Sequence, residues 1–192
     1  MPAMNRSRRI SLIAMFTALA IILNFAISIP APYAPYLSYE VWEVPILVAV
    51  ILMGFWSGTA VAALNAMILE LHPGPLPTGP FYNLIAEVAM ILGVLAALRV
   101  SRGKLKPVLV WAFATALGAS LRTLVMTFVN AAVLPQPPPI GFGYSSAAVP
   151  AALVVIGAFN FTITLFTVPL SYSVARAILL RYRPVFALDM SL

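Results

Sequence analysis

The sequence predicts an all-α integral membrane protein, a single bundle of six transmembrane helices in which the second and third are short. Composition and charge placement predict this class. Of the 192 residues, 62% are hydrophobic and 8% are charged, and the mean hydropathy is +1.03, whereas a soluble domain carries about 25% charged residues. All basic residues except Arg122 stand at the edges of apolar runs, as in the cytoplasmic loops of membrane proteins. One membrane domain is expected over residues 1–192.

The first helix is expected at residues 10–29, directly after the basic stretch Asn5–Arg9. An apolar run of about 20 residues is long enough to cross a bilayer once. It is also longer than the apolar part of a typical signal peptide, so retention is favoured over cleavage. The basic residues place the start of this helix in the cytoplasm.

The apolar run Glu43–Leu71 decides the topology of the chain. Its length, about 29 residues, is too great for one crossing and small for two. The basic cluster Arg99–Lys106 should be cytoplasmic like the N-terminus, which requires an even number of crossings between them. A reversal at Gly54–Gly58 supplies that number, because glycine permits a tight turn. Two short helices are therefore expected, at 43–53 and 56–71.

Three more helices complete the expected bundle. The first follows the Pro/Gly loop His72–Pro80 and covers 81–98. The next covers 107–134, and the last covers 147–180 with Pro169 as an expected kink. The last helix ends among basic residues, so both termini are expected in the cytoplasm.

Several functional classes are disfavoured by what the sequence lacks. It has no cysteine and a single histidine, His72, so thiol chemistry and multi-histidine metal sites are excluded. It has no GxxxxGK[ST] motif for binding ATP, and no paired acids at catalytic spacing. The two halves show no matching broken helices, which disfavours an inverted-repeat transporter. No enzyme activity, catalytic residue, cofactor or metal is therefore expected.

Polar side chains inside the apolar runs are costly and are candidates for function. They gather in the expected outer half of the bundle, under the Pro/Gly loops, and predict a pocket open to the outside. These residues are Asn65, Asn83, Glu87, Asn130 and Asn160. Taken singly, such an asparagine is more often a bond between helices than a ligand contact. Arg122, near the middle of its helix, is expected to pair with an acid such as Glu87.

Aromatic residues accompany the expected outer loops, among them Tyr39, Trp42 and Tyr82. They would either stack on a flat ligand or form the aromatic belt at the membrane interface. On the first helix, Ala14 and Ala18 share one face, where a partner helix could approach closely.

Six short segments resemble the S components of energy-coupling factor (ECF) vitamin transporters, most of all the riboflavin-specific branch. Ala14–Ala18 matches the AxxxA motif of that family, and Tyr39–Pro45 resembles its aromatic-acidic segment with Glu43 in place of Asp. Gly54–Gly58 resembles a GPxxG turn without the proline. The remaining segments are Gly79–Ala86, Met126–Asn130 and Phe159–Asn160.

The resemblance implies a membrane subunit that captures a vitamin outside a prokaryotic plasma membrane. A transmembrane T component, docked through Ala14 and Ala18, and cytoplasmic ATPases would complete the transporter. Asn130 and Asn160 would contact a flavin ring, while Ile163 stands where the riboflavin branch has lysine. The full set of expected substrate-binding residues is Tyr39, Trp42, Glu43, Asn65, Tyr82, Asn83, Glu87, Asn130 and Asn160.

Other functions stay open at this point. Replacement of the lysine leaves an S component for another vitamin, such as thiamine or biotin, as one alternative. A stand-alone carrier for small molecules is a second, and it would require polar residues that continue to the inner face. A structural membrane subunit without a small ligand is a third.

Overall fold

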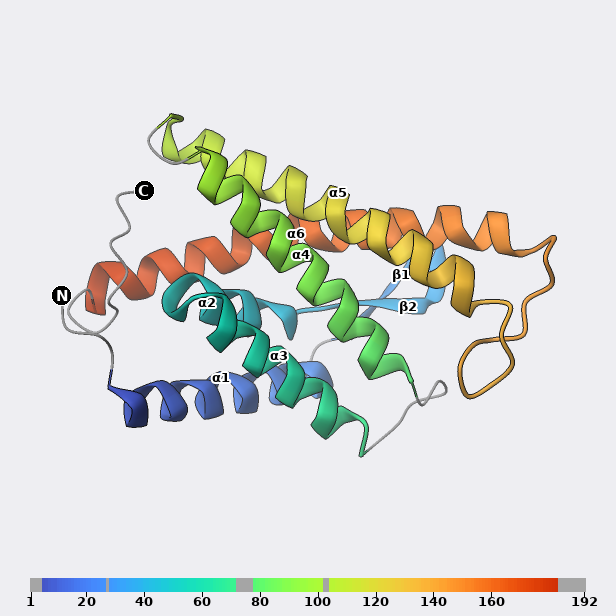
Figure 1. Ribbon diagram of the computed structural model, residues 1–192, viewed down its shortest axis with the longest axis horizontal. Coiled ribbons are helices and arrows are strands. Elements are labelled where there is room, and N and C mark those ends of the chain that lie inside the picture. Colours follow the sequence, from blue (N-terminus) through green and yellow to red (C-terminus); the bar gives the residue numbers. More distant parts are fainter. Residues whose placement is uncertain (1–4, 27, 72–77, 102–103, 183–192) are drawn as a thin grey trace.

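A computed structural model describes residues 5–26, 28–71, 78–101 and 104–182, and it shows six helices and one two-stranded hairpin in these ranges (Figure 1). In chain order the elements are α1 (Arg6–Ala26), β1 (Ser28–Ala31), β2 (Ala34–Glu40), α2 (Glu43–Met53), α3 (Phe55–Leu69), α4 (Gly79–Ser101), α5 (Pro107–Val133) and α6 (Val149–Tyr182).

The six expected helices are confirmed. Four of them, α1, α4, α5 and α6, are long and apolar enough to cross a membrane, whereas α2 and α3 have 11 and 15 residues. The largest difference in bounds is at the start of α1, which begins at residue 6 rather than 10. The expected loop at 72–80 lies partly outside the described residues, because the structure describes 78–80 but not 72–77.

The reversal in the apolar run occurs at Gly54, as expected. This residue lies between α2 and α3 with φ of +88°, a conformation that residues with a side chain rarely adopt. One turn later, a Cβ on Gly58 would lie 2.1 Å from Cγ2 of Val50 and 2.9 Å from its Cα. The two helices can therefore pack in contact only because position 58 has no side chain.

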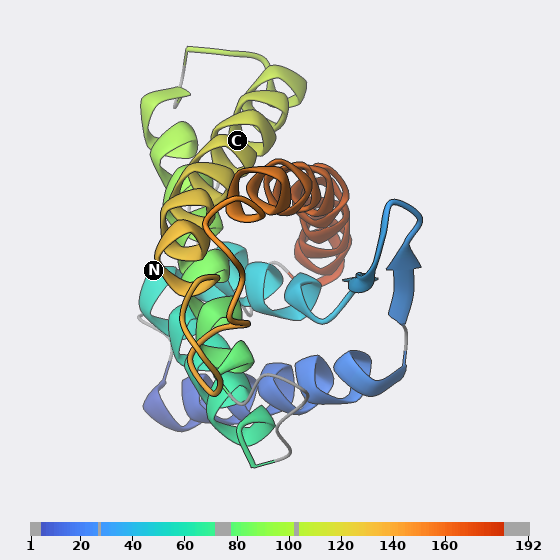
Figure 2. The same ribbon diagram turned by 90° about the vertical axis from the view of Figure 1, so that its right-hand side faces the viewer.

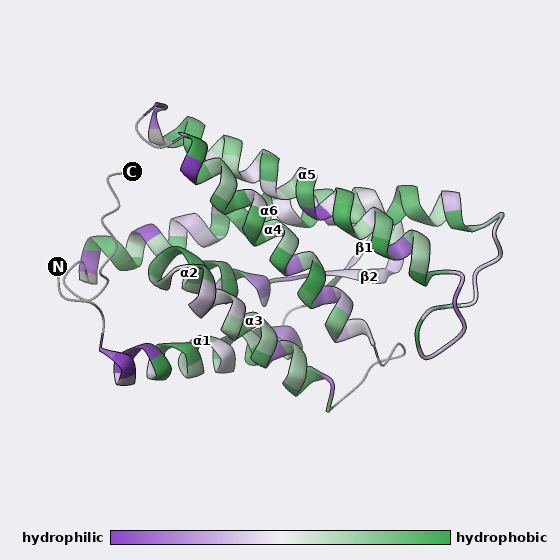
Figure 3. Cartoon of the chain, viewed as in Figure 1, coloured by the Kyte–Doolittle hydropathy of each residue, from purple (hydrophilic) through white to green (hydrophobic). Residues whose placement is uncertain are grey.

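Because the chain reverses at this point, the basic residues gather at one end of the bundle. The start of α1, the end of α4, the start of α5 and the end of α6 lie at the same end in Figure 1. Hydrophilic residues mark this end of the bundle in Figure 3, and long apolar stretches separate it from the opposite end. This is the arrangement that the positive-inside rule requires of a chain with both ends in the cytoplasm.

Helix α2 is the centre of the core. All 11 of its residues are buried, and it packs against α1, α3 and α6. At about 1.5 Å per residue it is roughly 16 Å long, about half of the apolar thickness of a bilayer. Its first turn therefore lies inside the bundle, and Figure 2 shows α2 beside α6 and the hairpin.

The segment after α1 is an antiparallel hairpin, β1–β2, where only a Pro-rich loop was expected. Ile29, expected at the end of the first helix, pairs with Tyr39 instead. Prolines argue against a strand because they cannot donate to a ladder. A two-stranded ribbon tolerates them, however, because each strand has a free outer edge. Pro30 and Pro35 both lie within the strands.

Candidate functional site: a buried ion pair and a pocket beneath the hairpin

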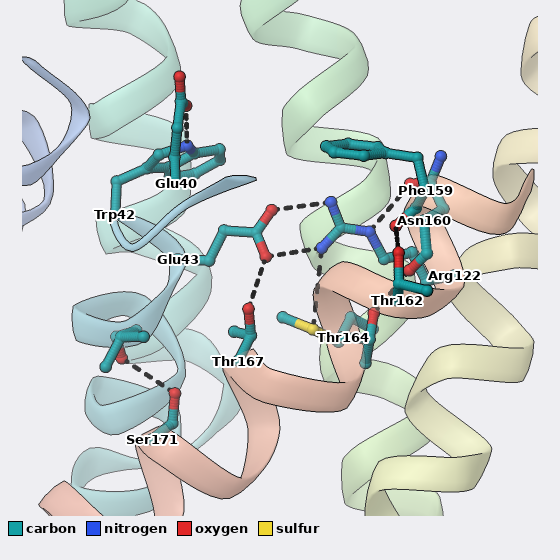
Figure 4. A network of polar contacts seen from close by, with 12 residues as sticks. Glu40, Trp42, Glu43, Arg122, Phe159, Asn160, Thr162, Thr164, Thr167 and Ser171 are labelled. Atoms are coloured by element: carbon teal, nitrogen blue, oxygen red, sulfur yellow. Dashed lines mark hydrogen bonds and ion pairs between the residues drawn. The ribbon is translucent and has the colours of Figure 1, made fainter. Parts of the chain in front are cut away.

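A fully buried ion pair joins α5 to the beginning of α2 (Figure 4). Nη1 of Arg122 donates to Oε2 of Glu43 and Nη2 donates to Oε1, both over 2.7 Å. The two side chains are 4% and 2% exposed. Two short parallel bonds of this kind hold a guanidinium and a carboxylate in one plane.

The position of Glu43 follows from the short α2 helix. The first turn of a helix has backbone N–H groups without helical partners and favours a negative charge. Glu43 occupies that turn, and because α2 is short the turn lies within the bundle. An arginine buried among apolar helices requires an acid or another polar partner. Glu43 is that partner for Arg122.

Helix α6 completes the network with an amide and a hydroxyl group. Nε of Arg122 donates to Oδ1 of Asn160 over 3.0 Å, while Nδ2 of Asn160 donates to the Ile156 carbonyl over 3.0 Å. The hydroxyl of Thr167 donates to Glu43 over 3.4 Å. Polar contacts in the core thus join α2 to α5 and α6, which lie far from it in the sequence.

The expected pairing of Arg122 with Glu87 is wrong, because Arg122 pairs with Glu43. Glu87 lies on α4, is 0% exposed, and has no hydrogen-bond partner for either carboxyl oxygen among the described residues. Met90, three residues further along α4, places its Sδ 3.9 Å from Nη1 of Arg122. Depth along a helix could not distinguish the two acids. Helix packing alone could not do so either, because α4 packs extensively against α5 and yet Arg122 pairs with Glu43 at the start of α2.

A pocket of about 520 Å³ lies between the hairpin and α6 and is lined by Ile29, Tyr39, Val41, Thr162 and Phe166. Small-molecule sites commonly have volumes of about 300–1,000 Å³ and mostly apolar walls. The rings of Tyr39 and Phe166 are 5.9 Å apart in an edge-to-face arrangement. A flat apolar ligand could therefore rest against aromatic walls here.

The hairpin is attached to α6 through Tyr39. Its hydroxyl forms a hydrogen bond with Oγ1 of Thr162 over 2.6 Å, and its ring lies 5.1 Å from that of Phe159. Burial raises the pKa of Tyr39 above its ordinary value, so the hydroxyl stays protonated and able to donate. Tyr33 extends this contact at the tip of the ribbon.

The base of the hairpin contains the acid Glu40 and the indole of Trp42. Nε1 of Trp42 donates to Oε2 of Glu40 over 2.8 Å, and the Ser28 hydroxyl donates to Oε1. Burial raises the pKa of Glu40, and the two hydrogen bonds partly oppose this rise. The Trp42 side chain is itself buried, so its polar edge binds the protein rather than standing free for a ligand.

The other expected residues do not join this network. Asn130 is half-buried and donates to the Met126 carbonyl over 2.7 Å. Asn83 is exposed, and Asn65 is buried on α3 with no partner for Oδ1 among the described residues. Tyr82 donates to the Ile140 carbonyl over 2.7 Å and so fixes the α5–α6 loop to α4.

Sequence reasoning missed the hydroxyl groups of α6. Thr164, Thr167 and Ser171 follow the predicted Asn160 at steps of three or four residues, and all four side chains are buried. That spacing places them on one face of a helix. The pattern was visible in the sequence and would have indicated which face of α6 meets α2.

No family model matches the chain. The chain is 33% identical over 90 residues to the riboflavin transporter RibU of Staphylococcus aureus (strain TCH60). The alignment covers 46% of this chain and 47% of the relative, so it spans about half the length of each.

A solved structure is similar over almost the whole chain. It is described as the structure and mechanism of the S component of a bacterial ECF transporter, and its TM-score is 0.63 with 22% identity. The superposition covers 94% of this chain and 96% of the other. This chain has the fold of an ECF transporter S component. The likeness includes the short α2 and α3 helices, which fit that membrane bundle.

Proposed function

We propose that this protein is the substrate-binding S component of an ECF-type vitamin transporter and that riboflavin is its substrate. The observation that carries the proposal is the identity of 33% over 90 residues to a riboflavin transporter, on a chain with the S-component fold. The aromatic pocket supports it, because a flavin is a flat ring system. The vitamin would enter from the end of the bundle opposite the basic residues.

The ring would lie between the hairpin and α6, with one face against the aromatic wall that Tyr39 and Phe166 form. Amide groups at Asn130 and Asn160 would bind polar atoms of the ring. Asn160 now bonds Arg122 and its own helix, so it would have to exchange at least one of these contacts on binding. The hairpin would cover the bound vitamin, held against α6 by the hydrogen bonds of Tyr39 and Tyr33 to Thr162.

Transport would require partners that bind outside the pocket. Ala14 and Ala18 are exposed on one face of α1, which packs against α2 and α3 with its opposite side. Small residues on a lipid-facing surface allow another helix to approach closely. A transmembrane T component would dock there, and cytoplasmic ATPases bound to it would supply the energy.

Purified protein in mild detergent tests the proposal. Riboflavin fluorescence should be quenched in a saturable way with one ligand per chain, and Asn160→Ala should weaken the binding. Thiamine and biotin serve as competitors and should have no effect. Binding of thiamine or biotin without any response to flavin would remove riboflavin as the substrate and leave a vitamin transporter of another specificity.

A stand-alone carrier is the second candidate, and the hydroxyl groups of α6 favour it. Thr167 and Ser171 continue beyond the ion pair towards the basic end of the bundle. Each is bonded within the protein, Thr167 to Glu43 and Ser171 to the Val44 carbonyl, which makes them contacts between α2 and α6. Riboflavin uptake into proteoliposomes that contain this chain alone would establish the carrier, and uptake only with the partners would reject it.

A further inference from the structure

The pocket beneath the hairpin has one polar corner. Among its lining residues Ile29, Val41 and Phe166 are apolar, and only Tyr39 and Thr162 carry a polar group on the side chain. In a mostly apolar site, a few placed polar groups fix the orientation of the ligand and decide which ligand binds. The hydrogen bonds that these two hydroxyl groups already make therefore determine what they can offer to a ligand.

Three hydroxyl groups and a backbone carbonyl form a row of short contacts at this corner. The hydroxyl of Tyr33 lies 2.5 Å from that of Tyr39, which lies 2.6 Å from Oγ1 of Thr162. Oγ1 of Thr162 in turn lies 2.8 Å from the carbonyl oxygen of Ala158, one turn earlier on α6. Two oxygens at such distances form a hydrogen bond, which requires one proton between them.

The carbonyl at the end of the row fixes the direction of every bond. A carbonyl only accepts, so the proton in its contact is that of Thr162, and the carbonyl of Phe159 is a second acceptor for the same proton. Thr162 then has no proton for Tyr39, so the Tyr39 hydroxyl donates to Thr162. By the same count the Tyr33 hydroxyl donates to Tyr39. None of the three hydroxyl groups retains a free O–H.

Thr162 retains the capacity to accept. A hydroxyl oxygen has two acceptor lone pairs, and Tyr39 occupies one of them. The Tyr33 hydroxyl also lies 3.3 Å from Oγ1, but its single proton serves the shorter contact with Tyr39, which makes this longer contact the weak branch of a shared bond. The corner can therefore accept a bond from the pocket and has no proton to donate. A ligand N–H or O–H complements it, whereas a ligand carbonyl or carboxylate would face lone pairs.

We propose that Thr162 is a specificity-determining residue whose hydroxyl oxygen accepts a hydrogen bond from an N–H or O–H group of the ligand. The proposal rests on the proposed function, and it names the kind of ligand atom that the polar corner recognises. Oxidised riboflavin has such donors in two places, the N3–H group of the ring and the hydroxyl groups of the ribityl chain. Both have the same chemistry, and the experiment distinguishes them.

A cycle of protein and ligand changes tests the proposal, with binding followed by flavin fluorescence in mild detergent. The ligands are riboflavin, N3-methylriboflavin, which lacks the ring N–H, and lumiflavin, in which a methyl group replaces the ribityl chain. The variants are Thr162→Val, which keeps the shape without the hydroxyl, and Thr162→Ser, which keeps the hydroxyl. Thr115→Val is the matched control, because Thr115 is buried near the basic end of α5 and its hydroxyl also donates to the carbonyl four residues earlier, that of Trp111.

Thr162→Val should bind riboflavin on the order of five- to tenfold more weakly than the wild type, the effect of one lost hydrogen bond. Thr162→Ser and Thr115→Val should stay within about twofold of the wild type. The ligand that lacks the recognised donor should bind equally well to the wild type and to Thr162→Val. If that ligand is N3-methylriboflavin, the ring N–H is the donor, and if it is lumiflavin, a ribityl hydroxyl is the donor.

A role in holding the hairpin alone would give a different pattern. Tyr39→Phe removes the bond between the hairpin and α6 but leaves Oγ1 of Thr162 in the pocket wall as an acceptor. This variant should weaken the binding of all three ligands by a similar factor and keep the ratios between them. Thr162→Val should change those ratios.

Two results would overturn the proposal. One is riboflavin binding by Thr162→Val within about twofold of the wild type. The other is an equal loss for all three ligands in Thr162→Val, the pattern expected of Tyr39→Phe. If Thr162→Val does not fold, the wild type decides, because weaker binding of one modified ligand supports the proposal and equal affinity for all three rejects it. No flavin binding by the wild type would overturn the proposed function together with this inference, whereas the other results leave the function intact.

Discussion

Removal of the Arg122 charge should be strongly destabilising, because it leaves the Glu43 carboxylate buried without a cation. The geometry of this pair indicates a cost of removal at the upper end of the range measured for ion pairs. Both charged side chains are at most 4% exposed, and two bonds of 2.7 Å join them. Breaking a buried pair by removing one partner costs about 3–5 kcal/mol. We therefore expect Arg122→Met to lower the free energy of unfolding by about that amount.

The double variant Arg122→Met/Glu43→Gln separates the effect of charge from that of packing. It removes both charges, and neutral replacements of a buried pair are often close to neutral in stability. We expect the double variant to be more stable than Arg122→Met alone. The coupling energy between the two substitutions should be at least about 2 kcal/mol, within the range seen for residues in direct contact.

The assay is equilibrium unfolding in mixed micelles, followed by fluorescence of the three tryptophans. Arg99→Met is the control, because Arg99 is exposed at the basic end of α4 and should change stability by less than about 0.5 kcal/mol. A cost below about 1 kcal/mol for Arg122→Met would refute the reasoning. So would a double variant whose cost equals the sum of the two single variants.

Three other predictions concern the hairpin and the reversal. The raised pKa of Glu40 means that the folded protein holds this proton more tightly than the unfolded chain. The contribution of Glu40 to stability is therefore present below the ordinary pKa of 4.5 and is lost as pH rises through the raised pKa. Glu40→Gln should remove that part of the pH dependence of thermal unfolding. Tyr39→Phe should cost about 1 kcal/mol and speed hydrogen exchange in β2, because it removes the bond to Thr162, whereas Tyr36→Phe at an exposed ring should not. Gly58→Ala should lower stability by about 1–3 kcal/mol in the same micelle assay, because its Cβ would overlap Val50, and an unchanged stability would contradict the close packing of α2 on α3.

The helices and their order could be predicted from the sequence because they follow from run length and charge. The reversal at Gly54 followed from the basic cluster at Lys104, which had to share a side with the N-terminus. Such reasoning uses only the length of apolar runs and the side of the membrane on which basic residues lie. It therefore also gave the short lengths of α2 and α3.

The partners within the site could not be predicted in the same way. Arg122 had two acids within reach, and only the packing of α2 in the centre selects Glu43 over Glu87. Asn130 is eight residues beyond Arg122, about 12 Å along α5, which is too far to share its bonds. The hairpin was missed because its prolines argue against strands, although a two-stranded ribbon leaves an outer edge where they fit.

Accessibility of single cysteines tests the central claim most directly, since the natural chain has none. The positions are Ile29→Cys in the pocket wall, Ser145→Cys in the exposed α5–α6 loop and Lys104→Cys at the basic end. In intact cells, an impermeant maleimide should label the first two and not the third, and riboflavin should slow labelling at position 29 alone. Labelling of Lys104→Cys from outside, or equal rates at position 29 with and without saturating riboflavin, would contradict an outward-facing vitamin pocket beneath the hairpin.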